Sequence, residues 1–361
     1  MGKILILSND AEGLYKFRKE LIQQFLEQGS EVYISIPKGI FETELKQMGC
    51  KFINTSLDRR GINPKTDAKL MFFYRKLIKK LHPDMVITYT IKPNIYGGLM
   101  SRMLRVPYAV NITGLGTAFQ SESMVKKLVT FLYKIALKKA KVVFFENIGN
   151  KQTFLDLHIL KEKQICVLNG AGVNLADYPF IEYPSDRGTR FLFIGRVMKE
   201  KGVDELFEAA ERITQQRSDV FFDVVGPLED DYKSRLEELV QKGVIVYHGY
   251  QKDVKPFIEK CHCFVLPSYH EGMANTLLEA GAMGRPLITS NIHGCLEAVE
   301  KGRNGYLAEA KNTESLLGQL EKFLGLSYEE RKRMGQASRE VVQERFDKKK
   351  VVGKTVSMIG V

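Results

Sequence analysis

The sequence contains no tryptophan and only five cysteines, at positions 50, 166, 261, 263 and 295. An odd and scattered set of cysteines argues against a disulfide framework and fits reduced thiols. The Cys-His-Cys segment at 261–263 has residue types that bind metals, but it begins an apolar run and no second ligand pair has matching spacing. We therefore expect no metal site there.

Long apolar runs and the Asp-x-Asp motif are also absent. No stretch approaches the roughly 20 apolar residues of a membrane-spanning helix, and the apolar part of residues 1–10 is too short for a signal peptide. These absences predict a cytoplasmic protein. The acidic run at 229–231 is the remaining candidate for a metal ligand, and we interpret it as an N-terminal helix cap.

Positive charge is concentrated in the first half of the chain. Residues 1–170 hold 27 lysines and arginines against 14 acids, a net +13, whereas residues 171–361 hold 27 against 29, a net −2. Segments 72–82 and 124–141 read as amphipathic helices, and the second carries a basic face of Lys127, Lys134, Lys138 and Lys141. Such a face attracts an anionic membrane surface, although a merely solvated face has the same pattern. No nucleic-acid-binding module is recognisable, so we expect no nucleic-acid partner.

Strand and helix patterns alternate along the whole chain. Short apolar segments such as 3–8, 85–90 and 142–146 alternate with helical patterns up to about residue 175, and a second series opens after the linker-like stretch 183–190. This alternation predicts two α/β domains, each with a doubly wound parallel sheet. We place them at 1–175 and 186–340, with a C-terminal helix at 341–361 that is a candidate to return to the first domain. Ligands of such sheets bind beyond the carboxyl ends of the strands, so we expect a site in a cleft between the domains.

Two acids eight positions apart, Glu271 and Glu279, flank the start of a helix predicted near Asn275. The backbone N–H groups of Ala274, Asn275 and Thr276 would then be open to phosphate oxygens, while the carboxylates accept hydrogen bonds from sugar hydroxyls. The alternative is a solvated loop acid followed by an ordinary glutamate of the first helical turn.

A second pair of charged residues, Arg196 and Lys201, lies in the first crossover of the second domain. Two cations five residues apart can hold a diphosphate from two sides. The loop has only Gly195 and Gly202, not the Gly-x-Gly-x-x-Gly pattern, so a dehydrogenase is disfavoured. Alone, these cations could also simply face solvent.

Together these motifs resemble the retaining GT-B glycosyltransferases that carry an E-x7-E motif, the glycosyltransferase family 4 type. The resemblance rests on "FIGRVMKEKG", "NGAGVN" and "LPSYHEGMANTLLEAGAMGRPLITS", and it covers nearly the whole chain. It implies that Arg196 and Lys201 bind the donor diphosphate, Glu271 the transferred sugar and Glu279 the ribose. It also implies that other donor contacts come from Gly13, Gly195, Tyr250 and the run Gly272, Met273, Ala274, Asn275, Thr276 and Leu277.

Within that family, "EGLYKFRKEL", "TYTIKPNIYGGLMSR" and "VNITGLGTAF" resemble bacterial enzymes that extend undecaprenyl-diphosphate-linked sugars, including α-1,3-N-acetylgalactosaminyltransferases and capsule and O-antigen enzymes. The resemblance places the acceptor near Asn111, Thr113, Gly114 and Gly116, although the glycines could equally serve turns. Many relatives have a histidine in this region and this sequence has none, so no catalytic base is assigned. The family's front-face mechanism implies that a donor diphosphate oxygen takes the proton.

The resemblance implies transfer of a hexose or N-acetylhexosamine from a UDP-sugar, without a metal or other cofactor, to a polyprenyl-diphosphate-linked sugar at the inner face of the cell membrane. Two other functions stay open. A nucleotide-sugar epimerase of GT-B shape would need an acid and base pair, and a degenerate sugar-nucleotide-binding protein should have lost the charged donor residues. His270 and His293 are lone loop histidines near the donor segment, for which a structural role is the simpler interpretation.

Overall fold

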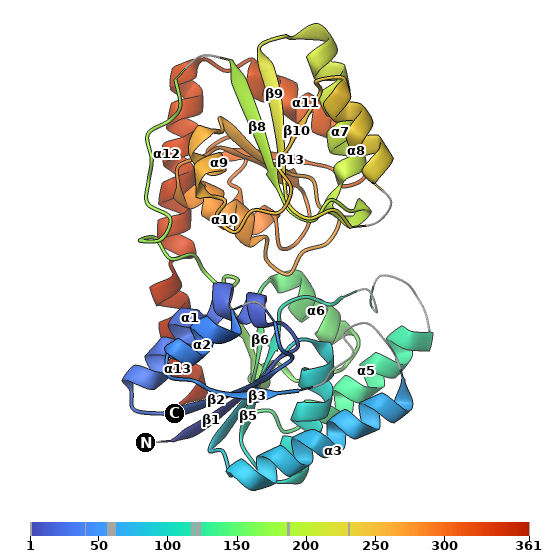
Figure 1. Cartoon of the computed structure of the whole chain (residues 1–361), viewed down its shortest axis with the longest axis vertical. Helices are drawn as coiled ribbons and strands as arrows, with labels where there is room; N and C mark the ends of the chain where they lie inside the picture. Colours follow the sequence, from blue (N-terminus) through green and yellow to red (C-terminus); the bar gives the residue numbers. More distant parts are fainter. Residues whose placement is uncertain are drawn as a thin grey trace. The chain divides into compact units, whose positions relative to one another are not determined.

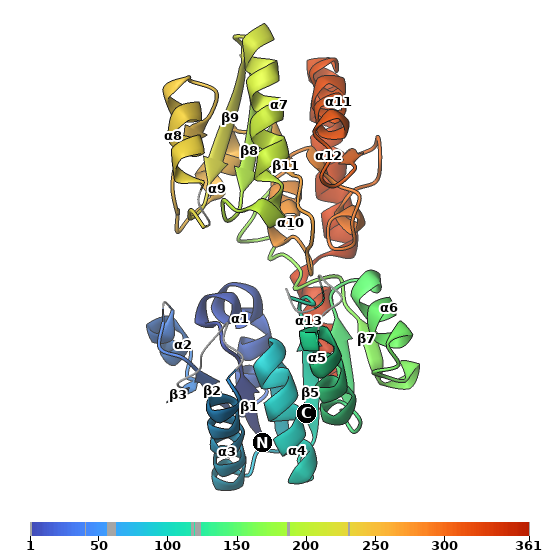
Figure 2. The same cartoon turned by 90° about the vertical axis from the view of Figure 1, so that its right-hand side faces the viewer.

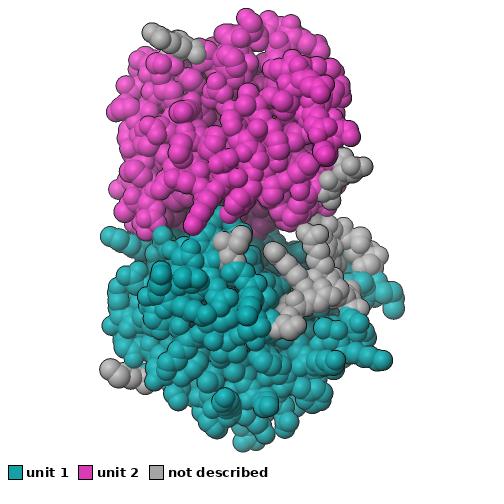
Figure 3. All heavy atoms as spheres, in the orientation of Figure 1, with its two compact units in different colours: residues 1–171, 348–361 teal, residues 172–347 magenta. Residues whose placement is uncertain are grey.

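The computed structural model describes residues 2–39, 41–55, 63–116, 119, 124–185, 188–229 and 232–360. The chain forms two compact units, one of residues Met1–Ala171 with Lys348–Val361 and the other of residues Gly172–Asp347 (Figure 1, Figure 3). The sequence placed the corresponding boundaries at 175 and 341. Each unit is a parallel α/β sheet with its own core.

Unit 1 contains a seven-stranded sheet in the order β3-β2-β1-β4-β5-β6-β7, and every pairing is parallel. Its strands are β1 (Lys3–Leu7), β2 (Glu31–Ile36), β3 (Lys51–Asn54), β4 (Met85–Tyr89), β5 (Tyr108–Ile112), β6 (Val142–Phe145) and β7 (Ile165–Val167). Its helices are α1 (Ala11–Glu27), α2 (Glu42–Gln47), α3 (Pro64–Leu81), α4 (Gly98–Met103), α5 (Met124–Ala136), α6 (Ile148–Asp156) and α13 (Lys348–Ile359), with a π-helix at Pro93–Gly97.

Both faces of this sheet are buried. Successive side chains of a strand point to opposite faces, and in β1 Ile4 and Ile6 join one core cluster while Leu5 and Leu7 join the other. The first cluster includes residues of α1, α2 and α13, and the second includes residues of α3, α4, α5 and α6 (Figure 2). Because both faces are covered, the strands read as the continuous apolar runs seen in the sequence.

The last helix, α13, is part of unit 1 although it follows unit 2 in the chain. It packs beside α1, and its Val351, Val352 and Ile359 join the core on that face. Lys348 at its start donates a 3.1 Å hydrogen bond from Nζ to the carbonyl oxygen of Phe17 in α1. Both ends of the chain therefore build the same unit.

Unit 2 contains a six-stranded parallel sheet in the order β10-β9-β8-β11-β12-β13. Its strands are β8 (Thr189–Ile194), β9 (Val220–Val225), β10 (Val246–Tyr247), β11 (Cys263–Leu266), β12 (Leu287–Ser290) and β13 (Gly305–Ala308). Its helices are α7 (Val203–Gln216), α8 (Lys233–Gln241), α9 (Lys255–Lys260), α10 (Asn275–Ala282), α11 (Thr313–Leu324) and α12 (Tyr328–Arg345). Helix α7 packs beside α11, and α10 packs beside α12 (Figure 1). The sheet is doubly wound, as predicted, and its strand order is 3-2-1-4-5-6.

The Cys-His-Cys segment lies at the start of β11, inside the core of unit 2. Cys261 and Cys263 are fully buried, and burial raises the pKa of the Cys261 thiol to about 12. His262 accepts a 3.1 Å hydrogen bond at Nδ1 from the backbone N–H of Arg190. The three side chains therefore stabilise the interior of the unit.

Candidate active site

The charged motifs of unit 2 meet at one edge of its sheet. In a doubly wound sheet the strand order reverses between two central strands, and ligands bind beyond their carboxyl ends. Here those strands are β8 and β11, which pair in parallel. The loop after β8 carries Arg196 and Lys201, and the loop after β11 carries Glu271. The structure therefore brings three predicted site residues to the edge where a ligand is expected.

These two loops are held close to each other by backbone contacts. Gly202 has φ +70°, and a Cβ at this position would lie 2.0 Å from the carbonyl oxygen of Pro267. Only glycine fits such an approach in the left-handed region. The backbone N–H of Tyr269 donates a 2.8 Å hydrogen bond to the carbonyl of Glu200, which joins the loops a second time.

Lys201 and Glu271 form an ion pair across the two loops, in which the Lys201 Nζ donates to Glu271 Oε1. Ser268, a fully buried serine that the sequence reading did not single out, donates a 2.8 Å hydrogen bond from its hydroxyl to the same carboxylate oxygen. Two donors thus fix Glu271. The predicted diphosphate cation and the predicted sugar-binding acid are direct partners in this structure.

Helix α10 begins at Asn275, as predicted, but the prediction of three open N–H groups was wrong at Ala274. The Ala274 N–H donates a 2.8 Å hydrogen bond to the carbonyl of Gly294. Gly294 has φ +92° and lies against the backbone of Glu271 and Gly272, where a side chain would not fit. Over the described residues, the N–H groups of Asn275 and Thr276 make no hydrogen bond. The open end of the helix is thus one residue further along than predicted.

Glu279 lies one turn inside α10, where it hydrogen-bonds the hydroxyl of Tyr178. Burial, followed by the charge and hydrogen bond of Glu279, raises the pKa of Tyr178. Met273 and Leu277 are buried in the core of unit 2, so these two positions can offer a ligand only backbone atoms. Local sequence patterns carry no signal for Tyr178, because its contact with Glu279 is long-range.

Arg196 has an acidic partner that the sequence interpretation assigned elsewhere. Its Nη1 lies 3.0 Å from Glu229 Oε2, and both side chains are partly exposed. Helix α8 is capped at Tyr232, which makes no side-chain capping hydrogen bond, so the interpretation of Glu229 as a helix cap was wrong. The other two acids of that run, 230 and 231, lie outside the described residues.

The remaining donor positions of unit 2 lie along the same edge. The N–H of Gly195 donates a 2.9 Å hydrogen bond to Val225, so it has a partner within the sheet. Tyr250 is exposed in the loop after β10, beside Gly249, whose carbonyl accepts from the Gly226 N–H at 2.8 Å.

The two loop histidines of the donor segment each lie near a charged residue outside the Lys201–Glu271 and Arg196–Glu229 pairs. His270 is exposed, and partial burial together with the nearby charge of Lys311 lowers its pKa. His293 Nδ1 lies 2.9 Å from Glu297 Oε1.

In unit 1 the strand order reverses between β1 and β4. Gly13 lies in the first turn of α1, after β1, and its N–H donates a 3.1 Å hydrogen bond to Asp10 Oδ1. A Cβ on Gly13 would lie 2.6 Å from the other Asp10 oxygen. The small residue here therefore accommodates the helix-capping aspartate, and its N–H has a partner within the chain.

Of the acceptor-side residues, Asn111 lies in β5 and the others follow that strand, which is next to β4. Asn111 is buried, and its Nδ2 donates a 3.3 Å hydrogen bond to the carbonyl of Thr88, so it stabilises the sheet. Thr113, Gly114 and Gly116 lie in the loop after the strand, and Gly116 has φ +68° with Ile91 beside it.

The residue that follows β4 carries a backbone feature without a sequence signal. Thr90 has φ +70°, which is rare for a β-branched residue and places strained backbone at the carboxyl edge of the sheet. A π-helix, Pro93–Gly97, begins three residues later. Strain and an irregular helix thus occur at the edge where the acceptor is expected.

Comparison with known proteins identifies the family. The family model "Glycosyl transferases group 1" matches residues 179–341, and "Glycosyl transferase 4-like" matches residues 3–147. The N,N'-diacetylbacillosaminyl-diphospho-undecaprenol alpha-1,3-N-acetylgalactosaminyltransferase of Campylobacter jejuni is 30% identical over 331 residues, which are 87% of each chain. The chain belongs to the glycosyltransferases.

Other relatives of this glycosyltransferase agree with that assignment. An Escherichia coli UDP-Gal:alpha-D-GlcNAc-diphosphoundecaprenol alpha-1,3-galactosyltransferase is 28% identical, over 72% of this chain and 71% of that protein. Among solved structures, a glycosyltransferase of Rickettsia africae superposes with a TM-score of 0.82 at 20% identity, covering 99% of this chain and 97% of that one. Anabaena HepE, solved with UDP and glucose, also has a TM-score of 0.82, at 16% identity over the whole of both chains. These structures confirm the predicted GT-B fold.

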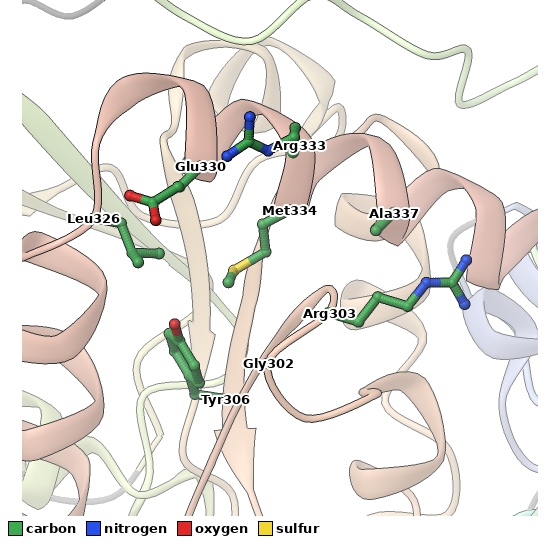
Figure 4. A pocket seen from close by; sticks show the side chains of 8 residues that line it. All are labelled: Gly302, Arg303, Tyr306, Leu326, Glu330, Arg333, Met334 and Ala337. Carbon is green, nitrogen blue, oxygen red and sulfur yellow. The ribbon is translucent and has the colours of Figure 1, made fainter.

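A pocket of about 380 Å³ on unit 2 of the glycosyltransferase lies away from these residues (Figure 4). Its lining includes Gly302 and Arg303, which precede β13, and Met334 and Ala337 of α12. None of the predicted donor residues lines it. Because it adjoins the amino end of β13, it is at the opposite edge of the sheet from the donor segment, and we assign it no role in the reaction.

Helix α5 of unit 1 exposes apolar side chains next to its lysines. Met124, Leu128 and Phe131 are 80%, 49% and 59% exposed, and they recur at the spacing of one helix face. Lys127 and Lys134 are exposed beside this stripe. We call these five residues the α5 surface. Within the described ranges, no helix combines the length and apolarity that crossing a bilayer requires.

Proposed function

We propose that this glycosyltransferase moves a hexose or N-acetylhexosamine from a UDP-sugar to a sugar linked to undecaprenyl diphosphate, with retention of the anomeric configuration. The observation that carries the proposal is the Lys201–Glu271 pair at the β8 and β11 edge, with Arg196 in the same loop as Lys201. The Campylobacter and Escherichia relatives are named for transfer to undecaprenyl-diphosphate-linked sugars. The donor nucleotide follows from the name of the second relative.

In the proposed reaction the chain's own charges stabilise the leaving group. As the bond between sugar and diphosphate lengthens, negative charge grows on the diphosphate, and preorganised cations stabilise it most at the transition state. Arg196 and Lys201 supply two positive charges. The open N–H groups of Asn275 and Thr276 at the start of α10 supply a third favourable interaction. Because these groups can stabilise the charge on the diphosphate, we propose that the reaction needs no metal.

The two glutamates have different proposed roles. Glu271, already fixed by Ser268, is placed to accept hydrogen bonds from hydroxyls of the transferred sugar when Lys201 turns to the diphosphate. Glu279 would accept hydrogen bonds from the ribose in exchange for the Tyr178 hydroxyl. Asn111 is neither basic nor exposed, so we propose that the acceptor proton passes to a donor diphosphate oxygen on the same face of the sugar.

We propose that the α5 surface brings unit 1 to the inner face of the cell membrane, where a lipid-linked acceptor is held. The exposed lysines complement anionic headgroups, and the stripe of Met124, Leu128 and Phe131 can enter the boundary between headgroups and acyl chains. The enzyme would thus be a peripheral membrane protein in the assembly of a capsule, O-antigen or related glycan. The net +13 of residues 1–170 supports the same orientation.

Incubation with labelled UDP-sugars and an undecaprenyl-diphosphate-linked acceptor tests the proposal. We expect label in the lipid product, an α-linkage from an α-linked donor by NMR, and loss of transfer in Lys201→Ala. Interconversion of the UDP-sugars without transfer would instead identify an epimerase. Binding of UDP-sugars with neither reaction would identify a degenerate binding protein.

A further inference from the structure

Beyond the ends of their strands, the loops after β8 and β9 continue to pair. The N–H of Gly195 donates to the carbonyl of Val225 at 2.9 Å, and the N–H of Val197 donates to Pro227 at 2.9 Å. The N–H of Glu229 then donates to Val197 at 3.1 Å. This ladder extends the parallel register past the carboxyl edge of the sheet. It pairs Val197 with Leu228, so Arg196 precedes one member of this bridge and Glu229 follows the other.

An ion pair joins their side chains. Arg196 Nη1 lies 3.0 Å from Glu229 Oε2, and the two side chains are 45% and 31% exposed. The pair differs from Lys201 and Glu271, which are more buried and in which Ser268 also binds the carboxylate. A guanidinium has five N–H donors in a planar fork, and a diphosphate can engage two of them at once. Because the partly exposed pair uses the Nη1 donor of this fork, a diphosphate that engages two donors can replace the carboxylate.

We propose that Glu229 is an exchangeable partner of Arg196, which it holds in the nucleotide-free enzyme and releases to the diphosphate of a nucleotide. This inference rests on the proposed function, because it takes the ligand of Arg196 to be a nucleoside diphosphate. Two anions, the carboxylate and the diphosphate, compete for one cation. The carboxylate thereby weakens nucleotide binding and speeds release of the nucleoside diphosphate product.

The competition also gives Glu229 a role that the sequence motif does not contain. It holds the guanidinium of Arg196 beside Glu229, so that the cation is already near the loop when the donor arrives. The cost is a negative charge that remains near the diphosphate after the exchange. Glu229 is thus a positioning residue whose removal should strengthen nucleotide binding, whereas removal of a residue that binds the nucleotide weakens it.

The test measures UDP binding to the full-length protein by calorimetry and UDP dissociation by stopped flow. For Glu229→Gln we expect binding about three- to tenfold tighter, because an exposed pair and a like-charge repulsion are removed together. Most of the change should lie in slower dissociation. In an Arg196→Ala background, the same substitution should change affinity by no more than about twofold, since the exchange no longer occurs.

Glu237→Gln is the matched control, because it removes one negative charge from the exposed surface of α8, where Glu237 faces Lys233 at 3.9 Å. We expect its UDP affinity to equal that of the wild type. If Glu237→Gln strengthened UDP binding as much as Glu229→Gln, the effect would come from net charge alone, and the proposed exchange would be wrong. Unchanged or weaker UDP binding in Glu229→Gln would also overturn it and leave the proposed function standing. Failure of the wild type itself to bind UDP would contradict the proposed function instead.

Discussion

The proposed membrane contact of the α5 surface would combine two attractions, which salt can separate. Burying a whole leucine, phenylalanine or methionine side chain contributes about 1.5 to 3 kcal/mol, so the exposed parts of Met124, Leu128 and Phe131 together contribute roughly 3 to 6 kcal/mol on insertion. Each lysine near an anionic surface contributes roughly 1 kcal/mol. High salt screens the second attraction and leaves the first. We therefore predict that binding to anionic vesicles weakens at high salt without disappearing.

The double variant Leu128→Ser/Phe131→Ser should lose about 2 to 3 kcal/mol of membrane binding, which is roughly 30- to 150-fold in the partition coefficient. Flotation with phosphatidylglycerol and phosphatidylethanolamine vesicles measures this loss at low and high salt. Val240→Ser on α8, where the valine is 43% exposed, is the control and should bind like the wild type. Replacement of Lys127, Lys134, Lys138 and Lys141 by glutamate should remove only the salt-sensitive part. The last two follow the end of α5 at Ala136, because the helix is shorter than the predicted 124–141. Complete release of the wild type by salt, together with unchanged binding of the double serine variant, would refute insertion and leave an electrostatic contact or a solvated face.

Four further predictions concern the donor site. Arg196→Ala and Lys201→Ala should each lower kcat on the order of 100-fold, because their partner charge grows in the transition state; near-normal kcat in both would exclude the diphosphate role. Glu279→Ala should weaken UDP binding roughly tenfold through lost ribose hydrogen bonds, and calorimetry that shows unchanged affinity would contradict this role. EDTA should leave transfer largely intact, whereas a loss that Mg²⁺ or Mn²⁺ restores would show that a metal takes part. Gly202→Ala should destabilise the fold by more than the roughly 1 to 2 kcal/mol that a left-handed alanine costs, because its Cβ would clash with Pro267. Gly243→Ala is the control, because Gly243 has φ +71° and open space around it. Equal denaturation midpoints for the two variants would show that the loops do not need this contact.

The fold was predictable because its signals are local. Alternating strand and helix patterns predict a doubly wound sheet, and that topology alone places the loops after β8 and β11 side by side. Glu271 and Lys201 are far apart in the sequence, yet the register of two parallel strands brings them together. The start of α10 was also predictable from a local signal, because residue type and periodicity mark helix ends.

The errors all concern contacts between distant segments. The Ala274 N–H meets the carbonyl of Gly294, and Glu229 meets Arg196 through a ladder that continues past two strands. Spacing rules that apply within one segment cannot predict contacts between residues so far apart in the sequence. Asn111 shows the same limit, because its partner, the carbonyl of Thr88, lies on the neighbouring strand; its acceptor-side role stays a prediction.

The return of α13 to unit 1 has a consequence for how the protein is made. A ribosome delivers residues 1–171 first, but the apolar positions Val351, Val352 and Ile359 that complete the core beside α1 come only after all of unit 2. The apolar surface of unit 1 beside α1 therefore stays exposed in the nascent chain while unit 2 is synthesised. A chain cut before α13 would therefore lose part of the core of the amino-terminal unit, although the cut lies after unit 2.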